Sequence, residues 1–471
     1  MTRDTIYAIS SGAGRAALAV LRLSGRAAGS ALSTLAQGDL PPPRRATVRA
    51  LRDASGEMID QALVLWMPGP ASFTGEDVAE LHVHGGLAVQ AAILRAVSSI
   101  PECRPAEAGE FTRRAFLNGR MDLTEVEGLA DLIAADTEAQ RRQSVRQMEG
   151  ALSRASADWR ESLLMALAQI EALLDFSDEE DVPERLDEAV LARVADARRG
   201  VTRALQDAGR GERLRDGVTV VIAGPPNAGK STLLNAIARR DVAIVSDIPG
   251  TTRDAIEVRC DLDGIPVTFV DTAGLRESLD PVEQAGVTIA TSRMQAADLV
   301  LRLEPVDVSP NSGIEFPSGI PALVVRTKID LLAESRSSVG RAGNCLAPEA
   351  LGKRESGGPD AHFQPCNQLE SIGISAQMGE GVAELLDRIR DHVVALIGDG
   401  EGALLTRERH RVILSDMSAC LDRALEPRPS PAPELVAEDL RLALRALGRM
   451  TGEVDVEEVL DRIFASFCIG K

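Results

Sequence analysis

The spacing of hydrophobic residues changes between the N-terminal part of the chain and the part that follows. Up to about residue 120, short apolar or alternating runs surround one helical stretch, which is typical of an α+β domain. The strand runs are 16–23, 62–66 and 78–83, and the helical stretch is 86–98. From Leu123 to about Arg213, Leu, Ala and Ile recur at spacings of three and four, which predicts long helices.

Patterns of buried strands begin at residue 218. Residues 218–223 are apolar except for Thr219, as in a central strand of a parallel sheet. Asp263-Gly264 predicts a hairpin turn, and further apolar runs alternate with helical pieces, which predicts an α/β nucleotide-binding domain. The runs are 257–262, 265–270, 299–303, 322–325 and 372–374. Residues 332–370 are rich in Ser, Gly and Pro and predict a long surface loop.

Helical periodicity returns after about Gly398 and continues to the end. We therefore expect the helices before and after the α/β segment to pack together, with the α/β domain inserted between them. The chain is thus predicted to be a multidomain α+β and α/β protein. The expected parts are an N-terminal α+β domain at 1–120, a helical first part at 121–215, the α/β domain at 216–397 and a helical second part at 398–471.

Charge and composition narrow the possible functions. The 471 residues include 52 Lys and Arg against 71 Asp and Glu, a net charge of −19, and only 3% are aromatic. So few aromatics exclude a broad base-stacking platform, and the acidity argues against a protein that coats nucleic acid. Six scattered cysteines without CxxC pairs, and the lack of a signal-peptide pattern or a long apolar run, predict a cytoplasmic protein without stable membrane insertion.

A phosphate-binding loop motif lies between a predicted strand and a predicted helix. Residues 224–231 read GPPNAGKS and match GxxxxGK[ST]. In this motif the backbone cradles phosphates, Lys230 neutralises the β- and γ-phosphates, and Ser231 ligates Mg²⁺. Asn227 can hold a monovalent cation beside the phosphates or can stabilise the loop, and both interpretations stay open. Ala228, Gly229 and Thr232 complete the expected loop contacts.

Three further motifs follow in the order that a GTPase requires. GTTRD at 250–254 offers hydroxyls for Mg²⁺, and DTAG at 271–274 offers a carboxylate for the metal and a glycine for the γ-phosphate. TKID at 327–330 resembles the guanine-reading NKxD, in which Asp330 accepts hydrogen bonds that adenine does not supply. Ser375-Ala376 would complete the base pocket. Together these motifs favour a GTPase over an ATPase.

Other segments resemble one protein family over nearly the full length of the chain. They are LRLSG at 21–25, SFTGED at 72–77, HGG at 84–86, GEF at 109–111, RAFLN at 114–118 and FCIGK at 467–471. With the GTPase motifs, they make the chain similar to the MnmE/TrmE family of tRNA uridine-5-carboxymethylaminomethyl modification GTPases. The resemblance implies an N-terminal domain that dimerises and binds a one-carbon tetrahydrofolate, in its 5-formyl or 5,10-methylene form. It also implies a Ras-like GTPase domain inserted into a helical domain.

The resemblance further implies an activity and its partners. A K⁺-activated GTPase of this kind modifies C5 of the wobble uridine of certain tRNAs by adding an aminomethyl or carboxymethylaminomethyl group. It works as a homodimer with a flavin-dependent partner, in a heterotetramer or larger complex, so that FAD enters only through that partner. The alternative is a GTP-switched assembly factor for ribosomes or membranes, which leaves residues 72–86 and Lys471 without a purpose.

Family positions assign roles to individual residues. The folate contacts are Arg22, Glu80, Arg120 and Lys471; the K⁺ ligands are Asn227, Ser246, Ile248 and Thr251; and the Mg²⁺ ligands are Ser231 and Thr252. The GTP contacts are residues 227–232, Ser246, Thr251, Thr252, Asp271, Thr272, Ala273, Gly274, Thr327, Lys328, Asp330, Ser375 and Ala376. Glu283 matches the glutamate that positions the attacking water, since Leu275 stands where Ras-like enzymes place a Gln. Cys468 matches a family thiol whose role is either chemical or structural.

Two departures from the family pattern bear on these sites. Thr327 replaces the Asn of NKxD, so that an amide that bonds the base and braces the phosphate loop is expected to be lost. Arg120 stands where Lys is usual, and the two are not interchangeable at a bidentate site. Basic residues also gather at 113–114, 120 and 141–146, which predicts a small tRNA site beside the folate pocket, with the partner supplying most phosphate contacts.

Overall fold

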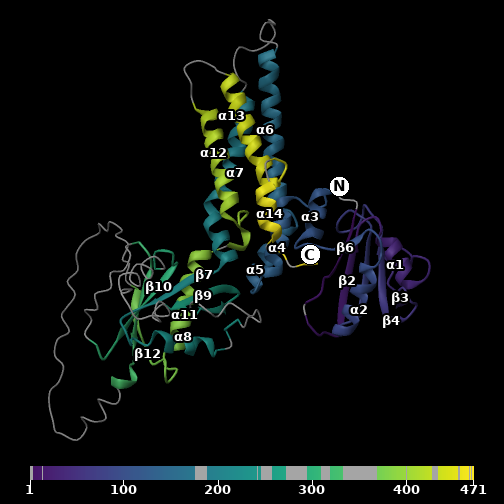
Figure 1. Ribbon diagram of the computed structural model, residues 1–471. Coiled ribbons are helices and arrows are strands. Elements are labelled where there is room, and N and C mark those ends of the chain that lie inside the picture. Colours follow the sequence, from purple (N-terminus) through teal and green to yellow (C-terminus); the bar gives the residue numbers. More distant parts are fainter. Residues whose placement is uncertain are drawn as a thin grey trace, which may run out of the picture. The chain divides into compact units, whose positions relative to one another are not determined.

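The chain divides into two structural units, each of which is described by itself. The first holds Met1–Ala134, Ser144–Gln206 and Arg407–Lys471, and the second holds Ala135–Gln143 and Asp207–Thr406. The computed structural model (Figure 1) describes residues 4–12, 14–175, 188–240, 242–244, 257–271, 294–308, 319–332, 369–398, 400–426, 433–454, 457–465, 467 and 469–470. The predicted loop at 332–370 lies almost wholly outside these residues, and the predicted domain boundaries stay predictions.

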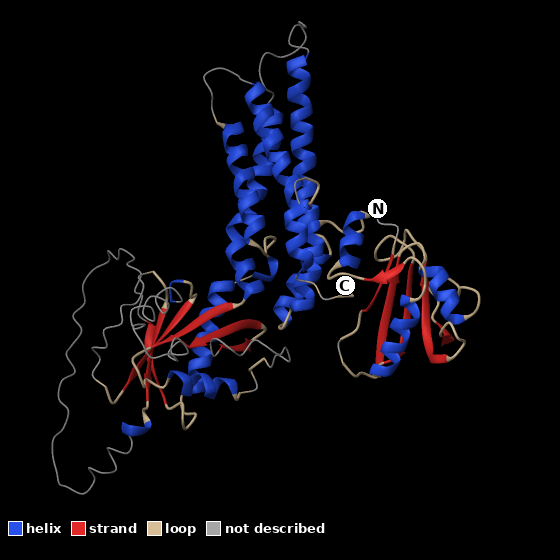
Figure 2. Cartoon of the chain, in the orientation of Figure 1, coloured by secondary structure: helices blue, strands red, loops and turns tan. Residues whose placement is uncertain are grey.

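A six-stranded sheet with two helices on one face forms the N-terminal part of the first unit (Figures 1 and 2). Its strand order is β3-β4-β5-β2-β1-β6, and only the β1–β6 pair is parallel. The strands are β1 Thr5–Ile9, β2 Leu18–Ser24, β3 Thr47–Arg52, β4 Met58–Met67, β5 Val78–His84 and β6 Cys103–Pro105, and the helices are α1 Ala28–Ala36 and α2 Leu87–Ser98. The expected strands and the expected helix are all present.

Alternation along the strands gives this sheet a covered face and an open face. In β2, Leu21 is fully buried under the helices, whereas Leu18 and Arg22 point to the opposite side. Helix α3 (Glu110–Leu117) lies against that side through Phe111, which packs with Ile6 and Ala8 of β1 and whose ring centre is 5.8 Å from the Arg22 guanidinium carbon. The central strands therefore present part of their second face to solvent.

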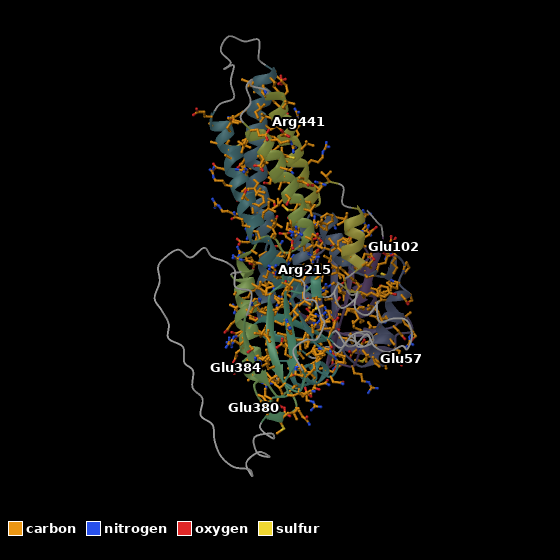
Figure 3. The ribbon with its side chains drawn as sticks, turned by 90° about the vertical axis from the view of Figure 1, so that its left-hand side faces the viewer. Glu57, Glu102, Arg215, Glu380, Glu384 and Arg441 are labelled. Carbon is orange, nitrogen blue, oxygen red and sulfur yellow. The ribbon has the colours of Figure 1, made fainter. Side chains whose placement is uncertain are left out.

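Long helices form the rest of the first unit. Helix α13 (Pro433–Thr451) packs against α12 (Glu408–Leu425) and against α6 (Ala151–Asp175), which confirms the expected packing of late helices with early ones. Arg441 on α13, labelled in Figure 3, is ion-paired with Glu171 on α6 at 3.0 Å. The others are α4 Leu123–Ala134 and α14 Glu457–Ala465, together with α5 Glu138–Met148 and α7 Glu188–Asp216, each of which has residues in both units. None of the described helices is both long and apolar enough to cross a membrane.

A buried ion network fastens α4 to the start of α12. Glu127 on α4 lies 2.6 Å from His410 Nε2 and accepts a hydrogen bond of 2.9 Å from Arg409 Nη2. Arg407 pairs with Asp131, also on α4, at 2.6 Å. Burial alone would raise the pKa of Glu127, but His410, Arg409 and Arg407 together lower that pKa well below its usual range. Glu127 is therefore a buried anion that depends on its partners.

The second unit holds a six-stranded sheet of order β12-β11-β10-β7-β9-β8. Only β8–β9 is antiparallel, and it is the predicted hairpin, with Asp263 (φ 61°) and Gly264 (φ 84°) in its turn. The elements are β7 Val218–Ala223, β8 Glu257–Leu262, β9 Ile265–Asp271, β10 Leu299–Pro305, β11 Ala322–Thr327, β12 Leu369–Ile374, α8 Lys230–Ala238 and α11 Val382–Ile397. Val220 and Val221, neighbours on β7, are buried in separate clusters on the two faces, which accounts for the continuous apolar runs.

Candidate functional site

The phosphate loop joins the end of β7 to the start of α8, as its motif predicts. Asn227 and Gly229 have φ values of 60° and 90°, in the left-handed region that glycine and asparagine tolerate best. Position 224 has no room for a side chain, because a Cβ at Gly224 would lie 2.9 Å from the carbonyl oxygen of Leu303 on β10. The loop is thus tightly wound against the carboxyl edge of the sheet.

The Lys230 side chain folds back over this loop. Its Nζ donates to the carbonyl oxygens of Gly224 and Pro225, each at 3.0 Å, and the residue is only 9% exposed. A helix N-terminus presents N–H groups and positive potential to an anion, and the ammonium adds a full charge beside them. This arrangement fits the phosphates of a nucleotide.

Ser231 and Asp271 meet beside the phosphate loop. Strands β7 and β9 are parallel neighbours with Ile222 opposite Asp271, so their carboxyl ends lie together. Ser231 Oγ donates to Asp271 Oδ2 at 2.8 Å. A hydroxyl and a carboxylate are the hard oxygen ligands that Mg²⁺ prefers, so these residues fit that ion. Ser231 would bind it directly and Asp271 would hold its water shell, and the bound ion supplies positive charge that offsets the phosphates.

The base-reading motif lies at the end of β11, beside the residues that follow β12. The Ile329 N–H donates to the Ile374 carbonyl at 3.3 Å, which brings residues 327–330 next to Ser375. Thr327 Oγ1 donates to the carbonyl oxygen of Ala228 in the phosphate loop at 2.8 Å. The expectation that the brace is lost with the asparagine is therefore wrong, because the threonine hydroxyl supplies it.

Lys328 is held by a residue that the sequence motifs did not single out. Its backbone has a φ of 63°, and its Nζ lies 2.7 Å from Asp307 Oδ2, just beyond β10. The hydrogen bond from Lys328 lowers the pKa of the Asp307 carboxyl and keeps it charged. Asp307 follows a buried strand at the same edge of the sheet, and this position is the signal by which it could have been found.

Part of the predicted site lies outside the described residues. These residues are Ser246, Ile248, Thr251, Thr252, Thr272, Ala273, Gly274, Glu283, Cys468 and Lys471. Their roles stay predictions. Across the described part of the chain, no three His, Cys, Asp or Glu side chains are grouped so that they could hold a metal ion.

Three of the four predicted folate residues lie near one another in the N-terminal domain. Arg22 and Glu80 are opposite each other on β2 and β5, and Arg22 Nε donates to Glu80 Oε1 at 2.9 Å. The Arg22 guanidinium carbon is 5.7 Å from the centre of the Phe73 ring, within cation–π range. Gly75 lies against Arg120, since a Cβ at Gly75 would be 3.3 Å from Arg120 Cγ. The SFTGED segment therefore connects the three charged residues.

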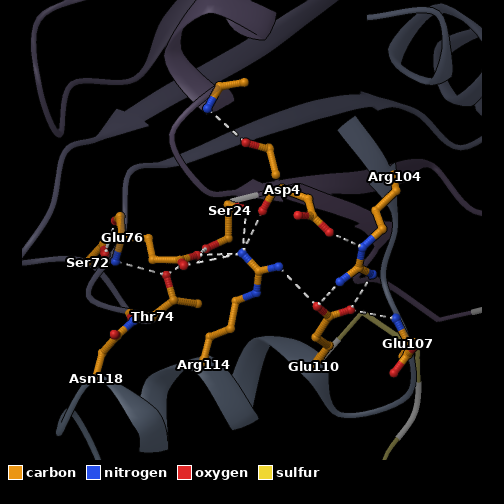
Figure 4. A network of polar contacts seen from close by, with 12 residues as sticks. Asp4, Ser24, Ser72, Thr74, Glu76, Arg104, Glu107, Glu110, Arg114 and Asn118 are labelled. Atoms are coloured by element: carbon orange, nitrogen blue, oxygen red, sulfur yellow. Dashed lines mark hydrogen bonds and ion pairs between the residues drawn. The ribbon is translucent and has the colours of Figure 1, made fainter. Parts of the chain in front are cut away.

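A network of polar contacts holds the SFTGED segment in place (Figure 4). Arg114 on α3 is 5% exposed and donates to Glu76 and to Glu110, each at 3.0 Å. Ser24 Oγ donates to the same Glu76 at 2.7 Å. Burial alone would raise the pKa of Glu110, but hydrogen bonds from Arg104 and Arg114 lower it, so the carboxylate stays ionised. The motif residue Glu76 is thus tied to a strand and to a helix.

This network corrects one expectation about tRNA binding. Arg114 was expected in a basic tRNA site, but it is buried and bonded to carboxylates, so it does not meet phosphates. Arg141 and Arg142 remain exposed, but both pair with Glu138, at 2.7 and 3.0 Å, which offsets part of their charge. The prediction of a basic site is wrong for Arg114.

The mostly parallel sheet carries the phosphate loop and the Ser231–Asp271 pair at one edge. This arrangement defines the class of the second unit as a P-loop GTPase domain. Two family models match the chain: the GTP-binding protein TrmE N-terminus over residues 5–120 and the MnmE helical domain over residues 123–468. The chain belongs to the MnmE family of tRNA modification GTPases, which confirms the family resemblance.

Curated relatives extend this match to the full length. The chain is 55% identical to the tRNA modification GTPase MnmE of Methylorubrum populi over 470 residues, which cover 99% of this chain and 98% of that one. It is 55% identical to the protein of the same name from Methylobacterium sp. strain 4-46, covering 99% and 100%. A solved structure of Aquifex aeolicus Era overlaps 37% of this chain and 56% of its own, at 24% identity and a TM-score of 0.24, which is too slight to support an inference.

Proposed function

We propose that the protein modifies C5 of the wobble uridine of certain tRNAs, using a one-carbon tetrahydrofolate and a flavin-dependent partner, and that GTP hydrolysis drives the cycle. The observation that carries this proposal is the pairing, in one chain, of a GTPase site with the Arg22–Glu80 pair of the N-terminal domain. A simple GTP switch has no need for this second site.

The residues around Arg22 suit a folate. The glutamyl tail of a folate is polyanionic and favours Arg and Lys, whereas the pterin ring pairs with a carboxylate such as Glu80. The Arg22 and Glu80 side chains are 24% and 17% exposed, so they are accessible yet held in place. Phe73 is 38% exposed beside them and offers a ring for stacking. Arg120 adds a second cation, and Lys471 is expected to add a third.

Replacing Arg22 with alanine is expected to weaken binding of 5-formyltetrahydrofolate about tenfold or more, because a charge-assisted contact is lost. The modified wobble uridine should then disappear from tRNA in cells that carry only this variant. GTP hydrolysis should be unchanged, since the change lies in the other structural unit. Calorimetry, nucleoside analysis of tRNA and a phosphate-release assay measure the three effects.

An exposed arginine of the same domain supplies the matched control. Arg45→Ala removes the same charge outside the proposed pocket and should bind folate as the unmodified protein does. Folate binding that survives in Arg22→Ala would overturn the folate site. Unchanged wobble uridine in cells that lack the protein would overturn the proposed function as a whole.

The open face of the N-terminal sheet supports a homodimer. Val48 and Leu63 are paired across β3 and β4 on this face, and they are 58% and 38% exposed. Apolar side chains paired on an uncovered sheet face favour association with a second surface. Sedimentation velocity of the folate-binding samples should give the mass of two chains, and a monomer at micromolar concentration would contradict the assembly.

We also propose that K⁺ activates GTP hydrolysis and that Glu283 positions the attacking water. Asn227 is exposed in the phosphate loop, where its amide oxygen is available to a monovalent cation. Phosphate release should be faster in KCl than in NaCl at equal ionic strength. Glu283→Ala should lose hydrolysis in both salts while it still binds GDP. Equal rates in the two salts would argue against the cation, and normal turnover of the variant would argue against Glu283.

The remaining partners follow from charge and compartment. With a net charge of −19, the chain as a whole repels tRNA phosphates. We therefore propose that the flavin-dependent partner makes most of the contacts to the tRNA phosphates and also carries the FAD. The described cysteines, Cys103, Cys260 and Cys420, are free thiols, which supports a cytoplasmic location.

A further inference from the structure

The charge of the chain is distributed unevenly between its parts. Residues 1–120 hold 13 Arg, no Lys and 11 Asp and Glu, a charge of +2 within a total of −19, so the rest of the chain carries −21. Four of these arginines lie within residues 40–52, LPPPRRATVRALR, a stretch without any carboxylate. The stretch forms strand β3 and the segment that leads into it. The positive charge of the N-terminal domain is therefore concentrated at one strand.

Strand β3 lies at the edge of the N-terminal sheet. It is the first strand in the order of that sheet and pairs only with β4, so its outer side has no neighbouring strand in the described part of the chain. Arg44 and Arg45 are exposed, and Arg49 and Arg52 are partly exposed. Residues advance about 3.3 Å along an extended strand, so Arg49 and Arg52 are about 10 Å apart. We call these four arginines the basic edge, since they follow one another along this border of the domain.

Two guanidinium groups of the basic edge are held by main-chain carbonyls rather than by carboxylates. That of Arg44 donates to the carbonyl oxygen of Ala71, and Nη1 of Arg52 donates to the carbonyl oxygen of Gly56 at 2.9 Å. Among the described residues, no carboxylate pairs with any of the four arginines. The arginines of the network in Figure 4, by contrast, pair with carboxylates. Because a carbonyl carries no net charge, its bond holds a cation in place and leaves the charge uncompensated.

We propose that the basic edge binds phosphates of the tRNA backbone and so supplies the contacts that this chain itself makes to its RNA substrate. This assignment rests on the proposed function, which takes a tRNA as the substrate. A guanidinium binds phosphate oxygens through two parallel hydrogen bonds, and a guanidinium without a carboxylate partner has its full charge available for them. Contacts to phosphates position an RNA without reading its sequence, so the basic edge orients the tRNA and does not select it.

The surroundings of the basic edge favour this role. The part of the chain that carries −21 repels an RNA backbone, so a tRNA approaches the domain whose net charge is positive. Within that domain, Arg114 is buried among carboxylates and Arg22 is paired with Glu80. Strands β4 and β5 separate β3 from β2, so the basic edge lies about 14 Å from the strand that carries Arg22. A tRNA and a folate can therefore be bound by the same domain without sharing side chains.

Fluorescence anisotropy of a labelled, unmodified tRNA transcript with the full-length protein tests the proposal. Four phosphate contacts predict that log Kobs falls with log[KCl] at a slope of about −3. Arg45→Gln combined with Arg49→Gln should weaken binding about tenfold or more at about 100 mM KCl and make the slope shallower by about 1.5. Arg45→Lys with Arg49→Lys keeps the charge and should restore the slope. Arg445→Gln on α13 removes an exposed arginine of the helical part and should bind tRNA normally.

The salt dependence and the partner decide between the outcomes. Recovery of affinity in the lysine variant, together with the shallower slope of the glutamine variant, supports the proposal. Binding by the glutamine variant within about twofold of the unmodified protein, at an unchanged slope, would overturn it. A glutamine variant that keeps its tRNA affinity but no longer binds the flavin-dependent partner would also overturn it, because the basic edge would then serve a protein.

Folate binding and GTP hydrolysis serve as checks on folding. Both should be unchanged in the glutamine variant, since the Arg22–Glu80 pair and the Ser231–Asp271 pair are intact. Should the double variant lose them, Arg45→Gln alone is measured in its place. If cells that lack the protein keep the modified wobble uridine, the proposed function fails. If those cells lose it and the glutamine variant still binds tRNA normally, only the assignment of the basic edge fails.

Discussion

GTP hydrolysis is expected to fall at least about 100-fold when Lys230 is replaced by alanine, because a preorganised charge at the phosphates is removed. Lys230 is 9% exposed as a residue, and its ammonium is held by two main-chain carbonyls of the phosphate loop. Its position is therefore set before the nucleotide arrives. The fold should survive, since Leu233, Leu234 and Ile237 still anchor α8 in the core.

Phosphate release under saturating GTP measures this effect. Arg239→Ala, at the exposed C-terminal end of the same helix, removes a cation without touching the loop and should hydrolyse GTP at the normal rate. A Lys230→Ala variant that folds and still turns over within about tenfold of the unmodified protein would contradict the assignment of this loop as the phosphate site.

Loss of about 3–5 kcal/mol of stability is expected when Glu127 is replaced by alanine, because a buried ionised carboxylate that bonds His410 and Arg409 is removed from its network. The Glu127 side chain is 2% exposed and that of His410 is 0% exposed. His410 Nδ1 has no hydrogen-bond partner among the described residues, so Nε2 makes the one contact that satisfies the ring. Removal of Glu127 would leave the buried His410 without its acceptor, and would leave Arg409 only the main-chain carbonyls of Arg449 and Met450.

The pH dependence of stability should carry the same signature. Burial lowers the pKa of His410 from its ordinary value of 6.5, and Arg409 and Arg407 lower it further, against the opposing effect of Glu127. The pKa of Glu127 is also lowered, from 4.5. As the pH falls, both groups therefore bind protons at a higher pH in the unfolded chain than in the folded protein. Stability should decline as the pH falls below 6.5, and more steeply below 4.5.

Urea unfolding followed by far-ultraviolet circular dichroism measures the effect of Glu127→Ala. Glu453→Ala is the matched control, because it breaks an exposed pair with Arg160, whose side chains are 52% and 41% exposed. Such surface pairs contribute about 0–1 kcal/mol, so the control should unfold almost as the unmodified protein does. Equal unfolding midpoints for the two variants would show that the buried network contributes no more than a surface pair.

Much of the α/β sheet could be predicted from the sequence. The runs 218–223 and 257–262 coincide with β7 and β8, because strands buried on both faces, or paired through a tight turn, leave continuous local patterns. The phosphate loop could also be predicted, because its motif lies within one short segment. Its glycines meet the backbone requirements of the loop, and its lysine supplies the charge for the phosphates.

Helix α1 was not predicted, and its packing explains why. Its sequence AGSALSTLA contains Gly, Ser and Thr, which have low helix propensity. The small residues are needed because the helix lies close to Trp66 on β4, where a Cβ at Gly29 would be 2.9 Å from the indole ring. Burial of Leu32 and Leu35 in the sheet core outweighs the weak local preference.

By itself, the sequence determined the class of the protein, its family and the segment that receives phosphates, because short motifs and periodic patterns depend on residues that are close in the sequence. Only the tertiary structure decided which charged and polar groups are partners. Glu127 and His410 meet across 283 positions, and Thr327 meets Ala228 across 99. No local pattern encodes such pairs, since the partners are chosen by packing and by the cost of leaving a buried charge or carbonyl unsatisfied. For the same reason Arg114, which resembles a tRNA contact in the sequence, is a buried support of the N-terminal site.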